Sequence, residues 1–289
     1  MTIQLDSKLL SSCHINFLFG AGVNGSGFPQ LNGFAKTKEF ISELLGTNVK
    51  SFENSIEELE ETDKKKAIEC FKDEFRHFSK NIDYSNISLK NIDSLFMSVN
   101  KLVGDSENRT KTTKQINIYT LNYDVIVETV LQKSGFLVNV ISSSNLENHN
   151  KFFNLIGYNS EIQTFIPTYL VSKIHGDIYN PILPGGDKYN QALMANKFEV
   201  LFQMKAKLSR FNSVLFLIGY SGNDEHINRI LRDCVTCGLT IYWFKYSNND
   251  VIPSDLEGKV FVIDNENKLD TTLVCGKMID QLWDKSLEE

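Results

Sequence analysis

The sequence predicts an α/β fold: a Rossmann-like, doubly wound and mostly parallel sheet with a helical insertion after the first strand. Three observations carry this prediction. Apolar runs typical of buried strands alternate with amphipathic segments from residue 116 onwards. An isolated apolar run, residues 17–19, enters a glycine-rich turn near the start, and residues 36–112 show mainly helical spacing. Strands that alternate with helices favour a parallel sheet covered on both faces.

The elements are expected in the following order along the chain. The helical insertion, residues 36–112, follows the first strand and mixes apolar side chains with many charges. Every residue of 214–218 is apolar, which predicts a central strand covered on both faces. The other strands are expected at 116–121, 136–141, 165–174, 239–244 and 260–263, and the helices at 124–133, 190–211, 224–234 and 271–286. We expect residues 1–289 to form a single domain that includes this helical module.

Composition and charge exclude several classes of protein. The chain has 289 residues, enough for a large core, and its net charge of -6 argues against nucleic-acid binding as the main function. No segment approaches the ~18 consecutive apolar residues of a membrane span. The first residues lack the basic flank and apolar core of a signal peptide. We therefore expect a cytoplasmic protein without membrane contact, whose five cysteines are reduced.

The cysteines do not predict a zinc site. Cys234 and Cys237 form one Cys-x-x-Cys, whereas a structural zinc ion usually needs four ligands. Their spacing is also that of one helix face, which favours packing in the core over metal binding. We therefore expect no metal in this protein.

Polar motifs follow three of the expected strands. Gly20, Ala21 and Gly22 come directly after the first strand, Asn122 follows the second, and His175 follows the strand at 165–174. In a parallel sheet the carboxyl ends of the strands meet at one edge, where ligands bind. The sequence therefore predicts that these groups share one crevice.

With a fourth motif after the strand at 214–218, which contains Gly219, Ser221 and Asp224, this set resembles the sirtuin superfamily. The match is to its NAD-consuming, non-deacetylase branch, known from bacterial antiviral defence. The motifs stand in the order of that family, from residue 20 to residue 224. The resemblance implies that Asn122 and His175 are catalytic. It also implies that NAD is bound by Gly20, Ala21, Gly22, Asn24, Pro29, Asp124, Gly219, Ser221 and Asp224.

The glycine turn has two interpretations. Residues 20–25 nearly complete the dinucleotide-binding pattern Gly-x-Gly-x-x-Gly, whose backbone amides can face a pyrophosphate, but a tight turn alone would also need such glycines. The chain departs from sirtuins at two places. Asn24 stands where they usually have serine, and Gln30, Leu31 and Asn32 follow Pro29 where they have Asp-Phe-Arg.

The remaining candidates also have structural alternatives. A carboxamide at Asn122 can orient water or a ribose, and an imidazole at His175 can accept a proton near neutral pH. The structural alternative for Asn122 and Asp124 is a cap that begins the following helix, and that for His175 is a structural histidine near a strand end. Asp224 can accept two hydrogen bonds from ribose hydroxyls or begin the helix from Glu225. Among the other histidines, His226 opens a helix and is expected to be exposed.

The leading hypothesis is an NAD glycohydrolase that produces nicotinamide and ADP-ribose, as the effector of an abortive-infection defence. The resemblance implies a homo-oligomer or a partner such as a HerA-like ATPase or an Argonaute. The helical module would cover the NAD site or bind that partner. The departures at Asn24 and after Pro29 keep a non-catalytic NAD or ADP-ribose sensing module open. A protein deacylase ranks last, because no cysteine for a zinc ribbon lies between His175 and Val214.

Overall fold

The structure is a computed structural model that describes residues 5–49, 52–104, 109–110, 112–136, 138–142, 158–159, 164–165, 168–179, 181, 198–246, 250–264 and 270–286. Seven strands form one sheet in the order β3-β6-β2-β1-β7-β8-β9, and every pairing in it is parallel. The bounds are β1 (His14–Phe19), β2 (Ile116–Thr120), β3 (Val138–Ile141), β6 (Tyr169–Lys173), β7 (Ser213–Ile218), β8 (Thr240–Lys245) and β9 (Phe261–Asp264). The predicted α/β class with a doubly wound parallel sheet is confirmed.

The chain leaves the middle of this sheet in two directions. On one side of β1 the sheet continues with β2, β6 and β3, where the chain forms the edge strand β3 before it returns to β6; on the other side β7, β8 and β9 follow in chain order. Since β1 and β7 are neighbours, the strand order reverses between them. Such a reversal leaves a crevice outside the carboxyl ends of the two strands, which is the usual ligand site of open α/β sheets.

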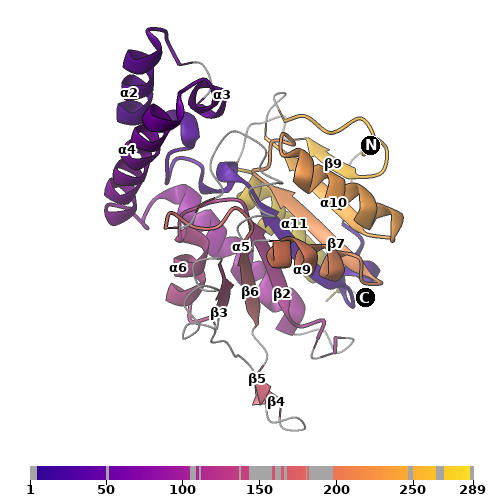
Figure 1. The fold of residues 1–289 in the computed structure, drawn as a ribbon. Helices are drawn as coiled ribbons and strands as arrows, with labels where there is room; N and C mark the ends of the chain where they lie inside the picture. Colours follow the sequence, from indigo (N-terminus) through magenta and orange to yellow (C-terminus); the bar gives the residue numbers. More distant parts are fainter. Residues whose placement is uncertain are drawn as a thin grey trace.

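Both faces of the sheet are covered, as the apolar strands require. Side chains alternate along each strand, so that Phe17 and Phe216 stack on one face with ring centroids 5.2 Å apart while Leu18 and Leu217 face the other. Helices α5 (Ile87–Gly104), α6 (Ile126–Lys133) and α11 (Thr271–Ser286) cover the first face, and α9 (Phe198–Leu208) and α10 (Glu225–Thr236) cover the second (Figure 1). All six residues of β7 are buried, which confirms the predicted inner strand.

Two sequence predictions need adjustment. The strand expected at 165–174 is divided between β6 and β5 (Thr164–Phe165), which pairs antiparallel with β4 (Tyr158–Asn159); residues 166–167 lie outside the described part. Residues 190–197 of the expected helix also lie outside it. Only one residue of the cysteine pair packs in the core: Cys234 is buried in α10, whereas Cys237 is exposed because the helix has already ended there.

The helical insertion contains α2 (Ala35–Leu45), α3 (Phe52–Glu57) and α4 (Glu61–Lys80), which lie beside the sheet in Figure 1. Phenylalanine rings hold them together: Phe34 contacts Phe71 and Phe75 at centroid distances of 5.0 and 5.9 Å. The last helix of the predicted range, α5, instead packs on the sheet and against α11. Its buried face is too wide for a peripheral helix, since ten of its residues are buried.

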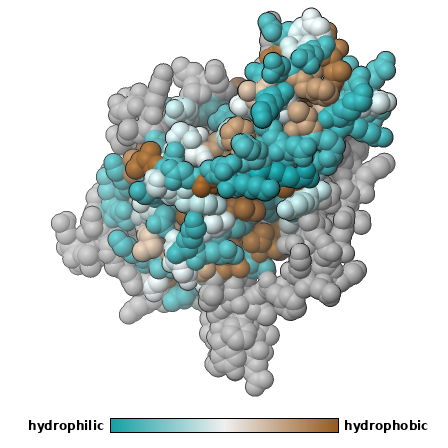
Figure 2. Space-filling model, turned by 90° about the vertical axis from the view of Figure 1, so that its left-hand side faces the viewer, coloured by the Kyte–Doolittle hydropathy of each residue, from teal (hydrophilic) through white to brown (hydrophobic). Residues whose placement is uncertain are grey.

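The surface on the side of α2 and α4 is mostly hydrophilic, with hydrophobic patches between (Figure 2). Within the described residues, no helix combines the length and the apolar character that a membrane span requires.

Candidate functional site

The strand register brings the predicted motifs to one edge of the sheet. Phe19 is level with Thr120 and with Ile218, and Thr120 is level with Lys173. The residues that follow these strand ends, Gly20, Leu121, Ile174 and Gly219, therefore form a row across β1, β2, β6 and β7. Asn122 and His175 each lie two residues beyond the paired ends of neighbouring strands. The glycine motifs lie on either side of the point where the strand order reverses.

The glycines at this edge are required by backbone packing. A Cβ atom at Gly20 would lie 2.3 Å from the carbonyl oxygen of Gly219, and one at Gly219, where φ is +66°, would lie 2.2 Å from the Val23 nitrogen. The amides of Gly20, Gly22, Val23 and Gly25 all donate to carbonyls of the protein. The tight-turn interpretation therefore accounts for these glycines by itself, and their contact with NAD stays a prediction.

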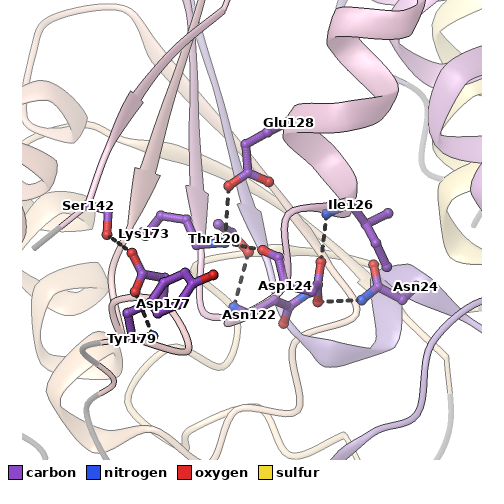
Figure 3. A network of polar contacts seen from close by, with 10 residues as sticks. All are labelled: Asn24, Thr120, Asn122, Asp124, Ile126, Glu128, Ser142, Lys173, Asp177 and Tyr179. Atoms are coloured by element: carbon purple, nitrogen blue, oxygen red, sulfur yellow. Dashed lines mark hydrogen bonds and ion pairs between the residues drawn. The ribbon is translucent and has the colours of Figure 1, made fainter. Parts of the chain in front are cut away.

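The polar side chains after β2 form a hydrogen-bonded network (Figure 3). Asn122 is buried, and its Nδ2 donates to the Gly20 carbonyl at 3.3 Å, so that the asparagine motif is attached to the glycine turn. Asp124 Oδ1 accepts from the Ile126 amide at 3.0 Å, and Oδ2 accepts from Asn24 Nδ2 at 2.8 Å. Val125, and not Asp124, is the N-cap of α6, but Asp124 accepts from the first amide of that helix and also orients Asn24.

Asn24 carries an unusual atom for a buried position. The residue is 2% exposed, and its Oδ1 is buried without a hydrogen-bond partner among the described residues. A buried acceptor without a donor is costly and uncommon in native structures. Its position between the glycine turn and Asp124 makes Asn24 Oδ1 a candidate acceptor for a donor on a ligand.

A buried ion pair lies behind the asparagine motif. Lys173 Nζ is 3.1 Å from Glu128 Oε1, and it also donates to the Asp124 carbonyl. Burial raises the pKa of the Glu128 carboxyl, and the neighbouring ammonium of Lys173 acts in the opposite direction. The pair connects the end of β6 to α6, and so fixes the backbone on both sides of the site. Glu128 was missed by the sequence analysis, although a lysine at the end of an apolar strand suggests a buried acidic partner.

His175 meets a second histidine. Its Nε2 lies 3.1 Å from Nε2 of His226, and both side chains are buried. The expectation that His226 is exposed is wrong, because Ile227 and Leu231 hold α10 on the sheet and bring its first turn to the sheet edge. At this distance one imidazole donates a hydrogen bond and the other accepts it, so at least one of the two is neutral.

Asp224 completes this cluster. Its Oδ1 lies 4.0 Å from Nε2 of His175. Asp224 occupies the N-cap position of α10, but its side chain makes no capping hydrogen bond there. The structure therefore confirms that Asp224 begins α10, through its backbone carbonyl, which accepts from the amides of Ile227 and Asn228, and its contact with a ribose stays a prediction.

The loop between β7 and α10 is fixed by residues that the sequence analysis did not single out. The hydroxyl of Tyr220 is 2.8 Å from Asn228 Oδ1, and Asn228 Nδ2 donates to the Gly222 carbonyl at 2.7 Å. Burial raises the pKa of Tyr220 well above its ordinary value, so its hydroxyl stays protonated. Ser221, which is partly buried, accepts from Asn223 Nδ2 at 3.2 Å. A tyrosine in a loop that pairs with an asparagine in the next helix carries no recognisable sequence signal.

The helical module contacts the asparagine and glycine motifs. The ring of Tyr123, next to Asn122, lies 6.2 and 6.4 Å from the rings of Phe71 and Phe75 in α4. In α5, Ser88 Oγ accepts from the Ser26 amide at 3.3 Å. Pro29 is partly buried in the loop between the glycine turn and α2, and Asn32 in that loop accepts from the amide that begins α3. The module therefore borders the edge where the motifs lie.

Comparison with known proteins agrees with this arrangement. Residues 116–257 match the family model of the SIR2-like domain, a range that contains Asn122, His175, Asp224 and His226. No curated protein matches the chain. The match shows that this part of the chain is similar to the SIR2-like domain, whereas membership of the sirtuin superfamily and an NAD-related function belong to the proposal below. The finer assignment to its antiviral branch is part of the proposal below.

Two similar solved structures are a crystal structure of a Sir2 homologue in complex with NAD and a structure that describes the mechanism and regulation of Sir2 enzymes. The first is 13% identical, with 98% of this chain and 96% of that chain covered and a TM-score of 0.47. The second is 11% identical, with 98% and 97% covered and a TM-score of 0.48.

Proposed function

We propose that this protein is an NAD glycohydrolase, which uses water to cleave the bond between nicotinamide and ribose and releases nicotinamide, ADP-ribose and a proton. The observation that carries the proposal is the position of Asn122 and His175, at equal register beyond the neighbouring strands β2 and β6. Because neighbouring strands lie only about 4.8 Å apart, both side chains can reach one ribose. They also lie beside the reversal of strand order, where a dinucleotide is expected.

The two residues have complementary chemistry. Cleavage of this bond passes through an oxocarbenium-like transition state, so a water molecule has to be held near the C1′ atom of the ribose. The neutral carboxamide of Asn122 orients the water or the ribose hydroxyls. His175 accepts the proton of the water, or polarises a ribose hydroxyl, as a general base.

The adenosine part of NAD would lie toward β7. Gly219, Ser221 and Asp224 follow that strand, and the unpartnered Oδ1 of Asn24, in the glycine turn, offers a further acceptor. Asp124 would act through Asn24, which it already orients at 2.8 Å. For Ala21 and Pro29, contact with NAD is proposed from the resemblance alone.

The biological setting rests on the resemblance alone. A glycohydrolase that depletes NAD during phage infection has to be silent until it is triggered. A homo-oligomer, or a partner such as a HerA-like ATPase or an Argonaute, would supply that control. The helical module is the proposed contact for such a partner, since it borders the asparagine motif through Tyr123.

A non-catalytic NAD or ADP-ribose binding module is the second candidate. The observations that favour it are Asn24 in place of serine, and Gln30, Leu31 and Asn32 after Pro29 where sirtuins have Asp-Phe-Arg. A protein deacylase has less support, because the cysteines of a zinc ribbon are missing between His175 and Val214.

Release of nicotinamide from NAD, measured with purified protein alone and with its genomic neighbour, separates these candidates. The glycohydrolase releases nicotinamide and ADP-ribose in equal amounts. The binding module retains NAD in calorimetry but releases nothing under any condition. Release that requires an acylated peptide would identify a deacylase instead.

A further inference from the structure

Three metal-binding side chains meet at the edge of the sheet. The ligand atoms of His175, Asp224 and His226 all lie within 4.8 Å of one another. They come from two distant parts of the chain, the end of β6 and the start of α10, so the fold and not the local sequence brings them together. Both histidines are buried and Asp224 is partly buried.

The distances are close to those of a bound ion. Zinc–nitrogen bonds of about 2.0–2.1 Å at a tetrahedral ion place two imidazole nitrogens roughly 3.3 Å apart. The two Nε2 atoms are 3.1 Å apart, and Asp224 Oδ1 is 4.0 Å from the nearer one. No two of the three ligand atoms are more than 4.8 Å apart, so a movement of the carboxylate toward the imidazoles would complete three ligand positions.

We propose that His175, Asp224 and His226 form a binding site for a divalent transition-metal ion, with Zn²⁺ as the best-suited occupant. Two imidazoles and a carboxylate are common zinc ligands, and a set of three leaves the fourth position to water. This site differs from the zinc ribbon of deacetylases, because it uses no cysteine. It also replaces the sequence-based expectation of no metal, which considered only the cysteines and took His226 to be exposed.

The ion would control His175. A metal on Nε2 occupies the lone pair that the histidine needs to accept a proton, so metal binding would inhibit NAD hydrolysis. This consequence rests on the proposed function, whereas the metal site itself does not. A silent state held by an exchangeable ion would suit an enzyme that has to be kept inactive.

The test titrates the metal-stripped protein with Zn²⁺ in a calorimeter. The wild-type chain is expected to bind one ion, and His226→Ala and Asp224→Asn are each expected to weaken binding at least tenfold. His77→Ala is the matched control, because His77 is exposed on α4 and should leave binding unchanged. His226→Gln provides a second variant, of more similar size, and circular dichroism checks that each variant is folded.

The cysteine pair is the competing explanation, and a second probe separates it. Co²⁺ bound to His175 and His226 shows visible bands without thiolate charge transfer, and Cys237→Ser should change neither the spectrum nor the affinity. Absence of binding, equal binding by wild type and His226→Gln, or loss of binding in Cys237→Ser would each overturn the proposal.

Nicotinamide release forms a separate arm. If the protein hydrolyses NAD, Zn²⁺ should inhibit wild type at the concentrations that saturate the calorimetric site, and chelation should restore the rate. A fully active zinc complex would overturn the inhibitory role. If no NAD is hydrolysed, the proposed function fails, and the calorimetric arm still decides whether the metal site exists.

Discussion

The polar groups that follow β2 and those at the start of α10 meet at the same sheet edge but are held in different ways. After β2, Asn122 and Asp124 donate to or accept from backbone groups, and the Lys173–Glu128 pair supports them from behind. At the start of α10, titratable side chains face one another, with two imidazoles at 3.1 Å and a carboxylate at 4.0 Å.

This difference indicates different roles: the polar groups after β2 mainly support the structure, and those at the start of α10 can take part in a reaction. Hydrogen bonds to the backbone fix a side chain and lower its freedom to exchange protons with a ligand. A cluster of titratable groups exchanges protons or binds cations, and it contributes little to rigidity. We therefore expect substitutions after β2, other than Asn122, to change stability, and substitutions around His175 to change activity.

The largest effect should come from His175→Ala and Asn122→Ala. Each is expected to reduce nicotinamide release about 10²–10⁴-fold, the usual contribution of a positioned acid–base group. The unfolding free energy should fall by only about 1 kcal/mol, because little apolar surface is removed. The double variant should lose little more than either single one, since both residues serve one ribose.

Activity assays at matched folding, with His77→Ala as the control, check this prediction. Full activity in either variant would remove that residue from the mechanism. Loss of NAD binding in both variants would indicate a positioning role instead.

Lys173→Met tests whether the ion pair of Lys173 and Glu128 supports the structure. The substitution leaves the buried carboxyl of Glu128 without its cation, which should lower the unfolding free energy by about 3–5 kcal/mol. The double variant Lys173→Met with Glu128→Leu should recover most of this loss, because it removes the second charge as well. Urea denaturation measures both, and a loss below 1 kcal/mol in the single variant would show that the pair is not a structural support.

The close contact of Gly219 with the backbone of Val23 should contribute slightly less to the unfolding free energy. Gly219→Ala places a Cβ atom 2.2 Å from a backbone nitrogen, and a loss of roughly 3 kcal/mol is expected. Gly135→Ala is the matched control, since φ is also positive there (+78°) but no atom lies within 4 Å of the new Cβ. Equal thermal shifts for the two variants would show that backbone strain, and not the close contact, accounts for the glycine.

The smallest effect is expected at Lys207, whose Nζ donates to Asn117 Oδ1 at 3.0 Å. Burial lowers the pKa of Lys207 from 10.5 to about 8, and the charge of Arg210 adds to this. Between these two values the unfolded chain holds a proton that the folded chain lacks, so this group adds stability as the pH rises.

Relative to Lys207→Met, the unfolding free energy of the wild type should increase by about 1–2 kcal/mol between pH 8 and pH 10, after allowance for partial exposure. Thermal unfolding of both proteins across this range measures the difference. A flat difference would show that the ammonium is well solvated in the folded state.

The secondary-structure elements, and the sheet edge at which the site lies, could be predicted from the sequence. Apolar runs such as 214–218 can be stable only as covered strands, and α11 begins and ends at the predicted residues, Thr271–Ser286. Because parallel strands place their carboxyl ends together, the motifs after 19, 120 and 173 could be assigned to one crevice from the sequence.

Which side chains meet at that edge could not be predicted from the sequence, because it depends on the packing of distant elements. The contact between His175 and His226 joins residues 51 positions apart on different elements, and the Lys173–Glu128 pair joins a strand end to a helix. Such contacts depend on how α10 and α6 lie on the sheet. The periodicity of a helix predicts which of its faces is buried, but it does not predict where on the sheet the first turn of the helix lies. For the same reason His226 was expected to be exposed and is buried.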